Sequence, residues 1–183
     1  IAVDPGTNHW YTVHRTESGY IDNLGSTPAK VDEWQHIAAV FITDGSTQTV
    51  ELYVDGELEN LSHGSSPFVE DGLEDLFIGN QNEPGAGAPG PHRQFYGWID
   101  AVRITQGRLY DGSFEPTEKL RLTAETVALW SLDEGAGTDI ADKGPSEYDG
   151  VLVGGDWSDE IVGDCGTGVI CIIDEESTDA DGD

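Results

Sequence analysis

The sequence predicts an all-β fold, and three observations carry this prediction. Two apolar runs rich in β-branched and aromatic residues, 37–43 and 49–54, flank a short turn that contains Asp44 and Gly45, which is the pattern of a β-hairpin. The chain has 24 glycines and no methionine. No stretch of useful length repeats apolar residues at the helical period. With 183 residues and 37% hydrophobic content, one domain with a sizeable core is expected.

Shorter patterns predict the strands that come before the hairpin. Residues 10–14 are typical of a strand, Ser18 and Gly19 of a turn, and residues 20–21 of the start of a returning strand. Residues 25–28 are expected to form a loop, and a short strand is expected around residues 30–31. In the second arm of the hairpin, alternate residues share a face. We expect one buried face (Val50, Leu52, Val54) and one solvent-facing face (Thr49, Glu51, Tyr53).

The chain after the hairpin predicts fewer strands, separated by loops. Residues 57–67 are polar and turn-rich, residues 76–78 predict a short buried strand, and residues 82–91 form a Gly/Pro/Ala loop. Residues 95–105 predict the longest strand of this part. A second block then predicts strands at residues 127–132 and 150–153. Residues 158–183 lose the apolar pattern and are expected to be an acidic tail that contains both cysteines.

Three motifs resemble those of a known family. They are residues 34–38 (WQHIA) with the strand end at 52–56 (LYVDG), residues 76–80 (LFIGN), and residues 95–104 (FYGWIDAVRI). In this order they resemble the laminin-G-like, concanavalin A-like lectin/glucanase jelly-roll family. The resemblance implies a jelly-roll β-sandwich of two antiparallel sheets over residues 1–157, followed by the acidic tail.

Residues 129–138 (LWSLDEGAGT) resemble a segment found around jelly-roll domains of this family. We expect residues 125–157 to supply closing strands. The family's first strands need roughly twice the 33 residues that precede Trp34 here. Either strands are missing, or the C-terminal block supplies them in permuted order, or a neighbouring subunit lends one. An incomplete sandwich leaves an open edge, which favours self-association.

The charge restricts the partners. The formal net charge of −28 argues against nucleic acid and against anionic membrane surfaces, and it favours cation binding or a highly solvated surface. No stretch approaches the roughly 18 to 20 apolar residues of a membrane span, so no membrane insertion is expected. Because Ile1 opens directly on strand-like sequence, we expect the chain to be a mature or excised piece of a secreted or cell-surface protein.

The search for catalytic residues finds no convincing set. Glycosidases of this superfamily need two carboxylates about 5 to 9 Å apart across the scissile bond. Asp133 and Glu134 are adjacent, and neighbouring residues of a strand point to opposite faces. The five histidines lack the spacing of a zinc site, and His36 is expected to make structural hydrogen bonds. Asp100 is expected to bond main chain or to pair with an arginine such as Arg103. The sequence therefore predicts that the chain is not an enzyme.

Calcium is the cofactor that the sequence favours. Calcium takes six to eight oxygen ligands, mostly carboxylates and carbonyls from loops. The last residues offer alternate carboxylates and resemble the first half of a calcium loop, although a disordered acidic tail is the favoured interpretation of this segment in isolation. A second candidate lies in the glycine-rich turn of the closing block, and laminin-G-like domains often hold one calcium. The two candidate sets are Asp179, Asp181 and Asp183, and Asp133, Asp142 and Asp149.

Cys165 and Cys171 enclose five residues. In an extracellular chain this spacing predicts a small local disulfide ring, with intermolecular pairing as the alternative. A zinc site would need two further ligands, and none is close in sequence.

The family resemblance implies that the chain binds a glycan or a surface protein. Sugars are usually held by an aromatic platform with polar partners. The residues expected to bind are Asn80, Tyr96 and Trp98; other candidate platforms are Trp10, Tyr20 and Tyr110, whereas Trp34 and Trp130 are expected in the core. We expect a non-catalytic extracellular binding or adhesion module. The alternatives are a structural subunit assembled by strand exchange and, less favoured, a glycosidase-like enzyme.

Overall fold

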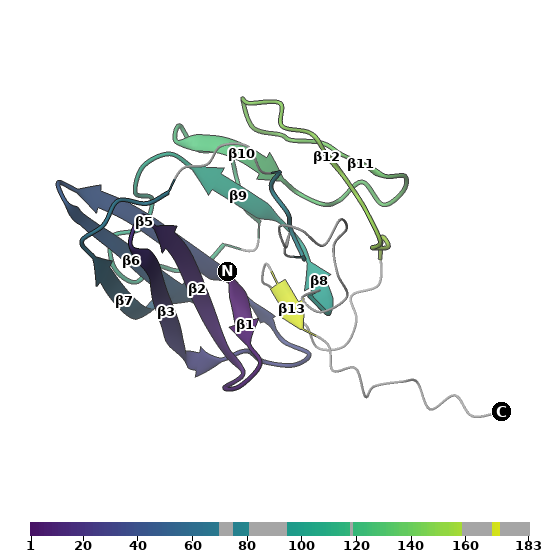
Figure 1. Ribbon diagram of the computed structural model, residues 1–183. Helices are drawn as coiled ribbons and strands as arrows, with labels where there is room; N and C mark the ends of the chain where they lie inside the picture. Colours follow the sequence, from purple (N-terminus) through teal and green to yellow (C-terminus); the bar gives the residue numbers. More distant parts are fainter. Residues whose placement is uncertain (70–74, 81–94, 118, 159–169, 173–183) are drawn as a thin grey trace.

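The computed structural model describes residues 1–69, 75–80, 95–117, 119–158 and, for the backbone only, 170–172. Every regular element in these ranges is a β-strand, and all pairings are antiparallel, so the predicted all-β class is confirmed (Figure 1). Among the described residues no helix is long and apolar enough to cross a membrane. The first seven strands are β1 (Ala2–Asp4), β2 (His9–Thr16), β3 (Gly19–Pro28), β4 (Trp34–Gln35), β5 (Ile37–Asp44), β6 (Thr47–Val54) and β7 (Glu57–Gly64). The later strands are β8 (Gly97–Ile99), β9 (Val102–Thr105), β10 (Thr126–Trp130), β11 (Asp139–Ile140), β12 (Gly150–Val151) and β13 (Ile170–Ile172).

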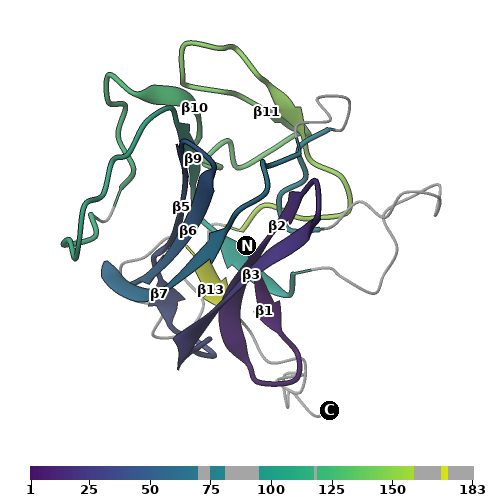
Figure 2. The ribbon, with the colours of Figure 1, turned by 60° about the vertical axis from the view of Figure 1, so that its left-hand side comes forward.

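Two three-stranded sheets make the N-terminal part of the sandwich. One has the order β1-β2-β3 and the other β5-β6-β7, and β3 contacts both β6 and β7 (Figure 2). Between them Trp10 packs with Ala29, Leu52 and Val54. The Trp10 indole donates to Gln35 Oε1 at 3.0 Å, so this large side chain is buried without losing its hydrogen bond.

The predicted hairpin is confirmed as β5 and β6, with Gly45 at φ 59° in the turn. The prediction that one face of β6 is solvent-exposed is wrong. Glu51 is 4% exposed and Tyr53 is fully buried, because residues 108–114 cover them. The covering segment lies against Gly56, where Phe114 N donates to Gly56 O at 2.9 Å. A Cβ at Gly56 would overlap the Phe114 carbonyl, so this close packing requires glycine.

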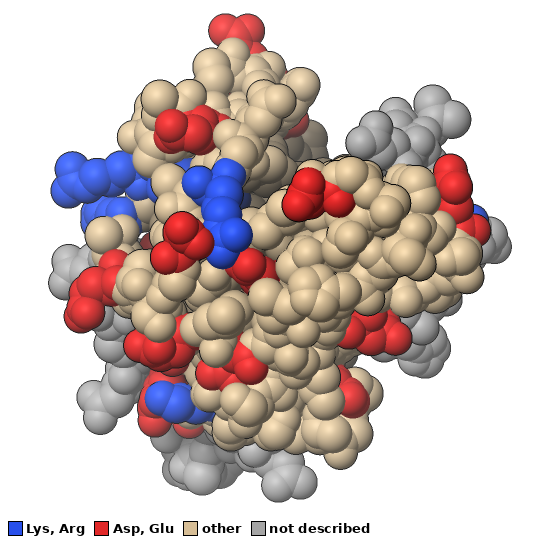
Figure 3. Space-filling view, turned by 90° about the vertical axis from the view of Figure 1, so that its left-hand side faces the viewer, with Lys and Arg blue, Asp and Glu red and all other residues tan. Residues whose placement is uncertain are grey.

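Few cations balance the acidic surface. Figure 3 shows acidic atoms spread over one face of the molecule, while the Lys and Arg atoms form fewer, separate groups. Ion pairs in the described ranges join Lys30 to Glu33, Arg108 to Glu51 and Asp111, and Lys143 to Asp133. Most acidic side chains therefore face solvent without a cationic partner.

The C-terminal block supplies β10, which pairs with β9 in a two-stranded sheet. β10 pairs with β9 through Ala128↔Ile104, Leu129↔Arg103 and Trp130↔Val102. Trp130 is buried, as expected, and its indole donates to Tyr148 O at 2.8 Å. Trp34 is only half-buried. β11 and β12 form a separate pair beyond this sheet.

Four other local predictions are wrong. Residues 25–28 belong to β3, and the expected loop at 57–64 is β7, because their side chains bond across the two sheets: Glu59 accepts from Ser26 and Thr27. Residues 76–78 form no strand, and Leu76 is 59% exposed. The long strand expected at 95–105 is divided into β8 and β9, since β8 pairs with β13 and β9 with β10.

β13 lies between two strands that are distant in sequence. It pairs antiparallel with β4 on one side and with β8 on the other (Figure 1). Residues 159–169 and 173–183 lie outside the described residues, so the acidic tail stays a prediction. The strand at β13 was not predicted.

Candidate ligand-binding groove

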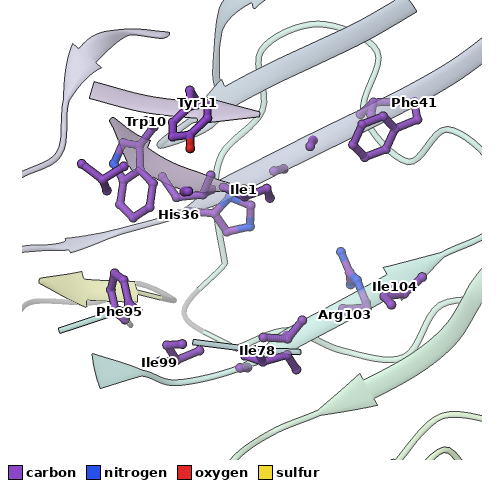
Figure 4. A pocket seen from close by; sticks show the side chains of 18 of the residues that line it. Ile1, Trp10, Tyr11, His36, Phe41, Ile78, Phe95, Ile99, Arg103 and Ile104 are labelled. Carbon is purple, nitrogen blue, oxygen red and sulfur yellow. The ribbon is translucent and has the colours of Figure 1, made fainter. Parts of the chain in front are cut away.

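A groove of about 1810 Å³ lies between the β4–β5 side and the β8–β9 side of the molecule (Figure 4). It is lined by every residue from 36 to 43 and every residue from 101 to 105. Successive residues of a strand point to opposite faces, so a cavity that covers one face would touch alternate residues only. The groove therefore runs along the edges of β5 and β9.

The walls of the groove are mainly apolar. Phe41 on β5 and Ile104 on β9 are both exposed to it, and Val13 and Ile78 add aliphatic surface from other segments. None of the described residues that line it is an aspartate or a glutamate. An apolar cavity with few polar groups is the usual form of a ligand site.

His36 is a polar group that the fold buries at the end of the groove. The residue is 5% exposed, and its ring packs edge-on against Tyr110 and Phe114. Its backbone N–H donates to Asp55 Oδ1 at 2.8 Å, but Nδ1 has no hydrogen-bond partner among the described residues. Burial and the nearby Arg103 charge lower the pKa of His36, so the imidazole is neutral at neutral pH. The predicted structural role holds for the backbone only.

Arg103 and Arg108 both line the groove, and Figure 4 shows the Arg103 side chain rising from β9 into the cavity. The Arg103 guanidinium donates to Arg121 O at 2.8 Å and to Tyr110 Oη at 3.1 Å. Both acceptors are neutral, and within the described part of the chain Arg103 forms no ion pair. Its charge is therefore available to a ligand.

Asp100 does not pair with Arg103, contrary to one of the two expected roles. It is exposed, and no hydrogen bond or ion pair of its carboxylate is found among the described residues. Burial of part of the group raises the pKa of Asp100, the Lys119 charge opposes this shift, and Asp133 adds to it.

Two of the three residues expected to bind a ligand line the groove. They are Asn80 and Tyr96. Trp98 does not line it: Trp98 belongs to β8, whereas Tyr96 precedes that strand. Of the other candidate platforms, Tyr110 and the buried core residue Trp10 also line the groove, whereas the exposed Tyr20 does not.

Sequence reasoning missed His36 and Arg103 as groove residues. Both lie in the family motifs, at 34–38 and 95–104, but only the folded chain brings these motifs to opposite sides of one cavity.

The three carboxylates expected to bind calcium in the closing block already have partners. Asp142 Oδ1 accepts from Leu129 N at 2.8 Å and Gly144 N at 2.7 Å, and its Oδ2 accepts from Tyr148 N at 3.0 Å. Asp133 pairs with Lys143 at 2.7 Å, and Asp149 Oδ1 accepts from Asp142 N. In the described ranges no group of three or more His, Cys, Asp or Glu side chains could hold a metal ion. These residues do not fit a calcium site as arranged, and calcium binding stays a prediction.

The remaining predicted sites lie outside the described residues. Asp179, Asp181 and Asp183 are in the undescribed tail, as is Cys165. Cys171 is in β13, where only the backbone is described. The disulfide and the tail calcium loop therefore stay predictions.

Comparison with known proteins agrees with this architecture. The family model described as the concanavalin A-like lectin/glucanases superfamily, of laminin G type, matches residues 1–112. No curated protein and no solved structure matches the chain. The match covers more than half of the 183 residues and includes β1 to β9, of which β1, β2, β5, β8 and β9 contribute residues to the groove. The chain therefore belongs to the laminin G-like branch of the concanavalin A-like lectin/glucanases superfamily.

Proposed function

We propose that the protein is a non-catalytic ligand-binding module of the cell surface or extracellular space, and that its ligand lies in the groove between β5 and β9. The observation that carries this proposal is the groove itself, which combines apolar walls with the His36 ring and the Arg103 guanidinium. The groove, about 1810 Å³, is larger than the roughly 300–1,000 Å³ of a typical small-molecule pocket, so it has room for part of a larger ligand.

The composition of the groove supports binding rather than hydrolysis. Two facing carboxylates are needed for glycoside cleavage. The described lining contains no carboxylate, and the neutral His36 has no carboxylate on its ring to orient it. The superfamily includes glycosidases, so a measurement of hydrolysis on glycan substrates belongs with the binding experiments; measurable turnover would contradict this part of the proposal.

The apolar lining of the groove favours a ligand with apolar parts over a purely polar sugar. Asn80 and Tyr96 offer a polar partner and an aromatic ring for a glycan, but Phe41, Ile78 and Ile104 offer only apolar contacts. Screening on a glycan array separates the two ligand classes.

The test of the site uses 8-anilinonaphthalene-1-sulfonate, an anionic probe of apolar surface. We expect saturable binding of the probe to the folded protein, with weaker binding in Ile104→Trp, which narrows the groove between β5 and β9. Val151→Trp is the matched control, because Val151 is exposed on β12 and does not line the groove. Equal binding by both variants would show that the groove is not the site.

The alternative function is a structural subunit that assembles through its open strands. The position of β5 at the edge of its sheet favours this alternative. Light scattering after size exclusion, with calcium and then with chelator, decides between them: a monomer in both supports the binding module, and a large species that dissociates on chelation supports the assembly.

A further inference from the structure

The edge of β5 that faces the groove carries backbone groups without partners in the described part of the chain. Asp55 N donates to His36 O at 2.7 Å, so His36 and Asp55, just before the first pair of the β5–β6 ladder, form a hydrogen-bonded pair. This pair determines which residues of β5 direct their backbone groups toward β6. In such a ladder every second residue directs its N–H and C=O toward the neighbouring strand. The N–H and C=O groups of Ile37, Ala39, Phe41 and Thr43 therefore point away from β6, along the open edge.

The edge of β9 on the other side of the groove also has backbone groups that point away from its paired strand. Leu129 on β10 lies opposite Arg103, but its N–H donates to Asp142 Oδ1 at 2.8 Å and its C=O accepts from Lys143 N at 2.7 Å. The Leu129–Arg103 pair is therefore not hydrogen-bonded, and the backbone N–H and C=O of Arg103 point away from β10. This side of β9 borders the groove.

The strands that precede these two edges already hold a strand between them. β4 continues into β5 through His36, and β8 continues into β9 through residues 100–101. β13 pairs antiparallel with both β4 and β8, with its first residue between Gln35 and Ile99. Figure 4 shows the two sides separating beyond this point to form the groove. The geometry for inserting a strand is thus present at one end of the gap.

The polar groups of the groove indicate the chemistry of an occupant. His36 is almost fully buried with Nδ1 unpartnered, and its ring points into the cavity. Arg103 donates to two neutral oxygens and has further N–H donors for an anion. An acidic side chain near this end would accept hydrogen bonds from Arg103, while apolar side chains would cover Phe41 and Ile104.

We propose that the groove is a strand acceptor: an extended peptide, apolar at alternate positions and carrying one carboxylate for Arg103, inserts antiparallel to β5 and β9 and completes both edges. This inference rests on the proposed function and names the ligand class of the same site. Strand addition of this kind draws affinity from main-chain hydrogen bonds and specificity from alternate side chains. Two copies of the chain, each with a net charge of −28, repel each other, which favours a foreign peptide over a second copy.

The experiment uses two eight-residue synthetic peptides of alternating valine and threonine, one with a central glutamate and the other with glutamine there. Amide hydrogen exchange is followed by NMR on the full chain. We expect the glutamate peptide to slow exchange at Ile37, Ala39, Phe41 and Thr43 by at least about tenfold, because their N–H groups become hydrogen-bonded. The amides of Ala38 and Val40, which the ladder already directs to β6, should change little.

Variants of the protein then separate backbone pairing from charge recognition. Ala39→Pro removes an N–H from the open edge without removing one from the β6 ladder, and we expect it to abolish peptide binding; Ala39→Val keeps that N–H and should bind. Arg103→Gln should weaken the glutamate peptide by about tenfold and the glutamine peptide little. Comparison of the two peptides on the unaltered protein tests the charge even where a variant folds poorly.

Three outcomes would overturn the proposal. The first is saturable binding of 8-anilinonaphthalene-1-sulfonate in the groove without protection by either peptide, which leaves the proposed function standing. The second is protection of the four edge amides in the free monomer, which shows that the chain itself covers the edge. The third is their protection only in a dimer detected by light scattering, which identifies the occupant as a second copy. Failure of the dye to bind as well would remove the proposed function along with this inference.

Discussion

Glu51 is an acidic side chain held in the interior by two donors. Its carboxylate accepts from Tyr53 Oη at 2.8 Å and from the Arg108 guanidinium at 2.9 and 3.0 Å. Arg108 comes from the segment that covers β6, so this contact joins the hairpin to a part of the chain 57 residues away. The carboxylate therefore stabilises the cover as well as the strand.

Replacing Glu51 should destabilise the protein. In Glu51→Ala the Tyr53 hydroxyl and the Arg108 guanidinium lose their acceptor, and we expect a loss of about 2 kcal/mol in the free energy of unfolding. Urea denaturation measures this as a lower midpoint with an unchanged slope. Glu57→Ala is the control: Glu57 is exposed and, within the described ranges, its carboxylate accepts only from Ser113 Oγ, so its effect should stay within about 0.5 kcal/mol. Equal effects would contradict the importance of the buried contact.

His36 should make stability depend on pH near neutrality. Burial, with the Arg103 charge, lowers the pKa of His36 in the folded state, so the unfolded chain binds the proton more readily. The stabilising contribution is complete above the unfolded value of about 6.5 and is lost as pH falls below it. We expect thermal melting between pH 7.5 and 5 to show a smaller decrease in His36→Gln than in the unaltered protein.

His14 is the control for this experiment, because burial lowers its pKa as well. His14→Gln should retain the part of the pH dependence that belongs to His36. A profile of His36→Gln identical to that of the unaltered protein would show that His36 does not contribute.

Among the strands, β10 is held at its end by hydrogen bonds to one carboxylate, that of Asp142. Burial alone would raise the pKa of Asp142, but N–H donors from Leu129, Tyr148 and Gly144 outweigh this and lower it. The side chain thus fixes the end of β10 to the loop that follows. This arrangement makes Asp142 a structural residue whose contribution to stability should not depend on calcium.

We expect Asp142→Ala to lower the melting temperature by roughly 4–8 °C, since three backbone donors lose their acceptor. The decrease should be the same in calcium and in chelator, because the carboxylate acts through hydrogen bonds. Asp139→Ala, at an exposed position of β11, should change the melting temperature little. A decrease seen only in calcium would instead support the calcium site expected at Asp133, Asp142 and Asp149.

At the scale of the whole molecule, charge repulsion opposes folding. The chain has 36 acidic and 8 basic residues, and exposed like charges destabilise the compact state at low ionic strength. The melting temperature should therefore rise between about 0.01 and 0.3 M sodium chloride, where the screening length falls from about 30 Å to below 10 Å. The same titration near pH 4, where carboxylates are partly protonated, should show a smaller rise. A melting temperature that falls with salt would contradict this prediction.

The sequence predicted the parts of the fold that depend on local pattern. The β5–β6 hairpin follows from two apolar arms around Asp44 and Gly45, and β10 from the apolar run that ends at Trp130. The burial of Glu51 could not be predicted, because its cover comes from Arg108 and a distant segment. Nor could β13, since its partners β4 and β8 meet it only in the folded chain.

For the site as well, local sequence pattern and distant packing must be distinguished. Asn80 and Tyr96, which lie in family motifs, both line the groove, whereas Trp98 on β8 does not; whether any of them binds a ligand stays a prediction. The orphaned ring nitrogen of His36 is a property of packing, which no spacing in the sequence reveals.

The pairing of β10 with β9 has a consequence for how the molecule responds to tension. Trp130, at the end of β10, lies beside Val102, at the start of β9. A pull that separates the chain before β9 from the chain after β10 acts first on this pair, and it breaks the remaining hydrogen bonds one after another rather than together. Because its hydrogen bonds break in sequence, the β9–β10 pair should separate at a small force. This would detach β10 and leave β9 with two open edges.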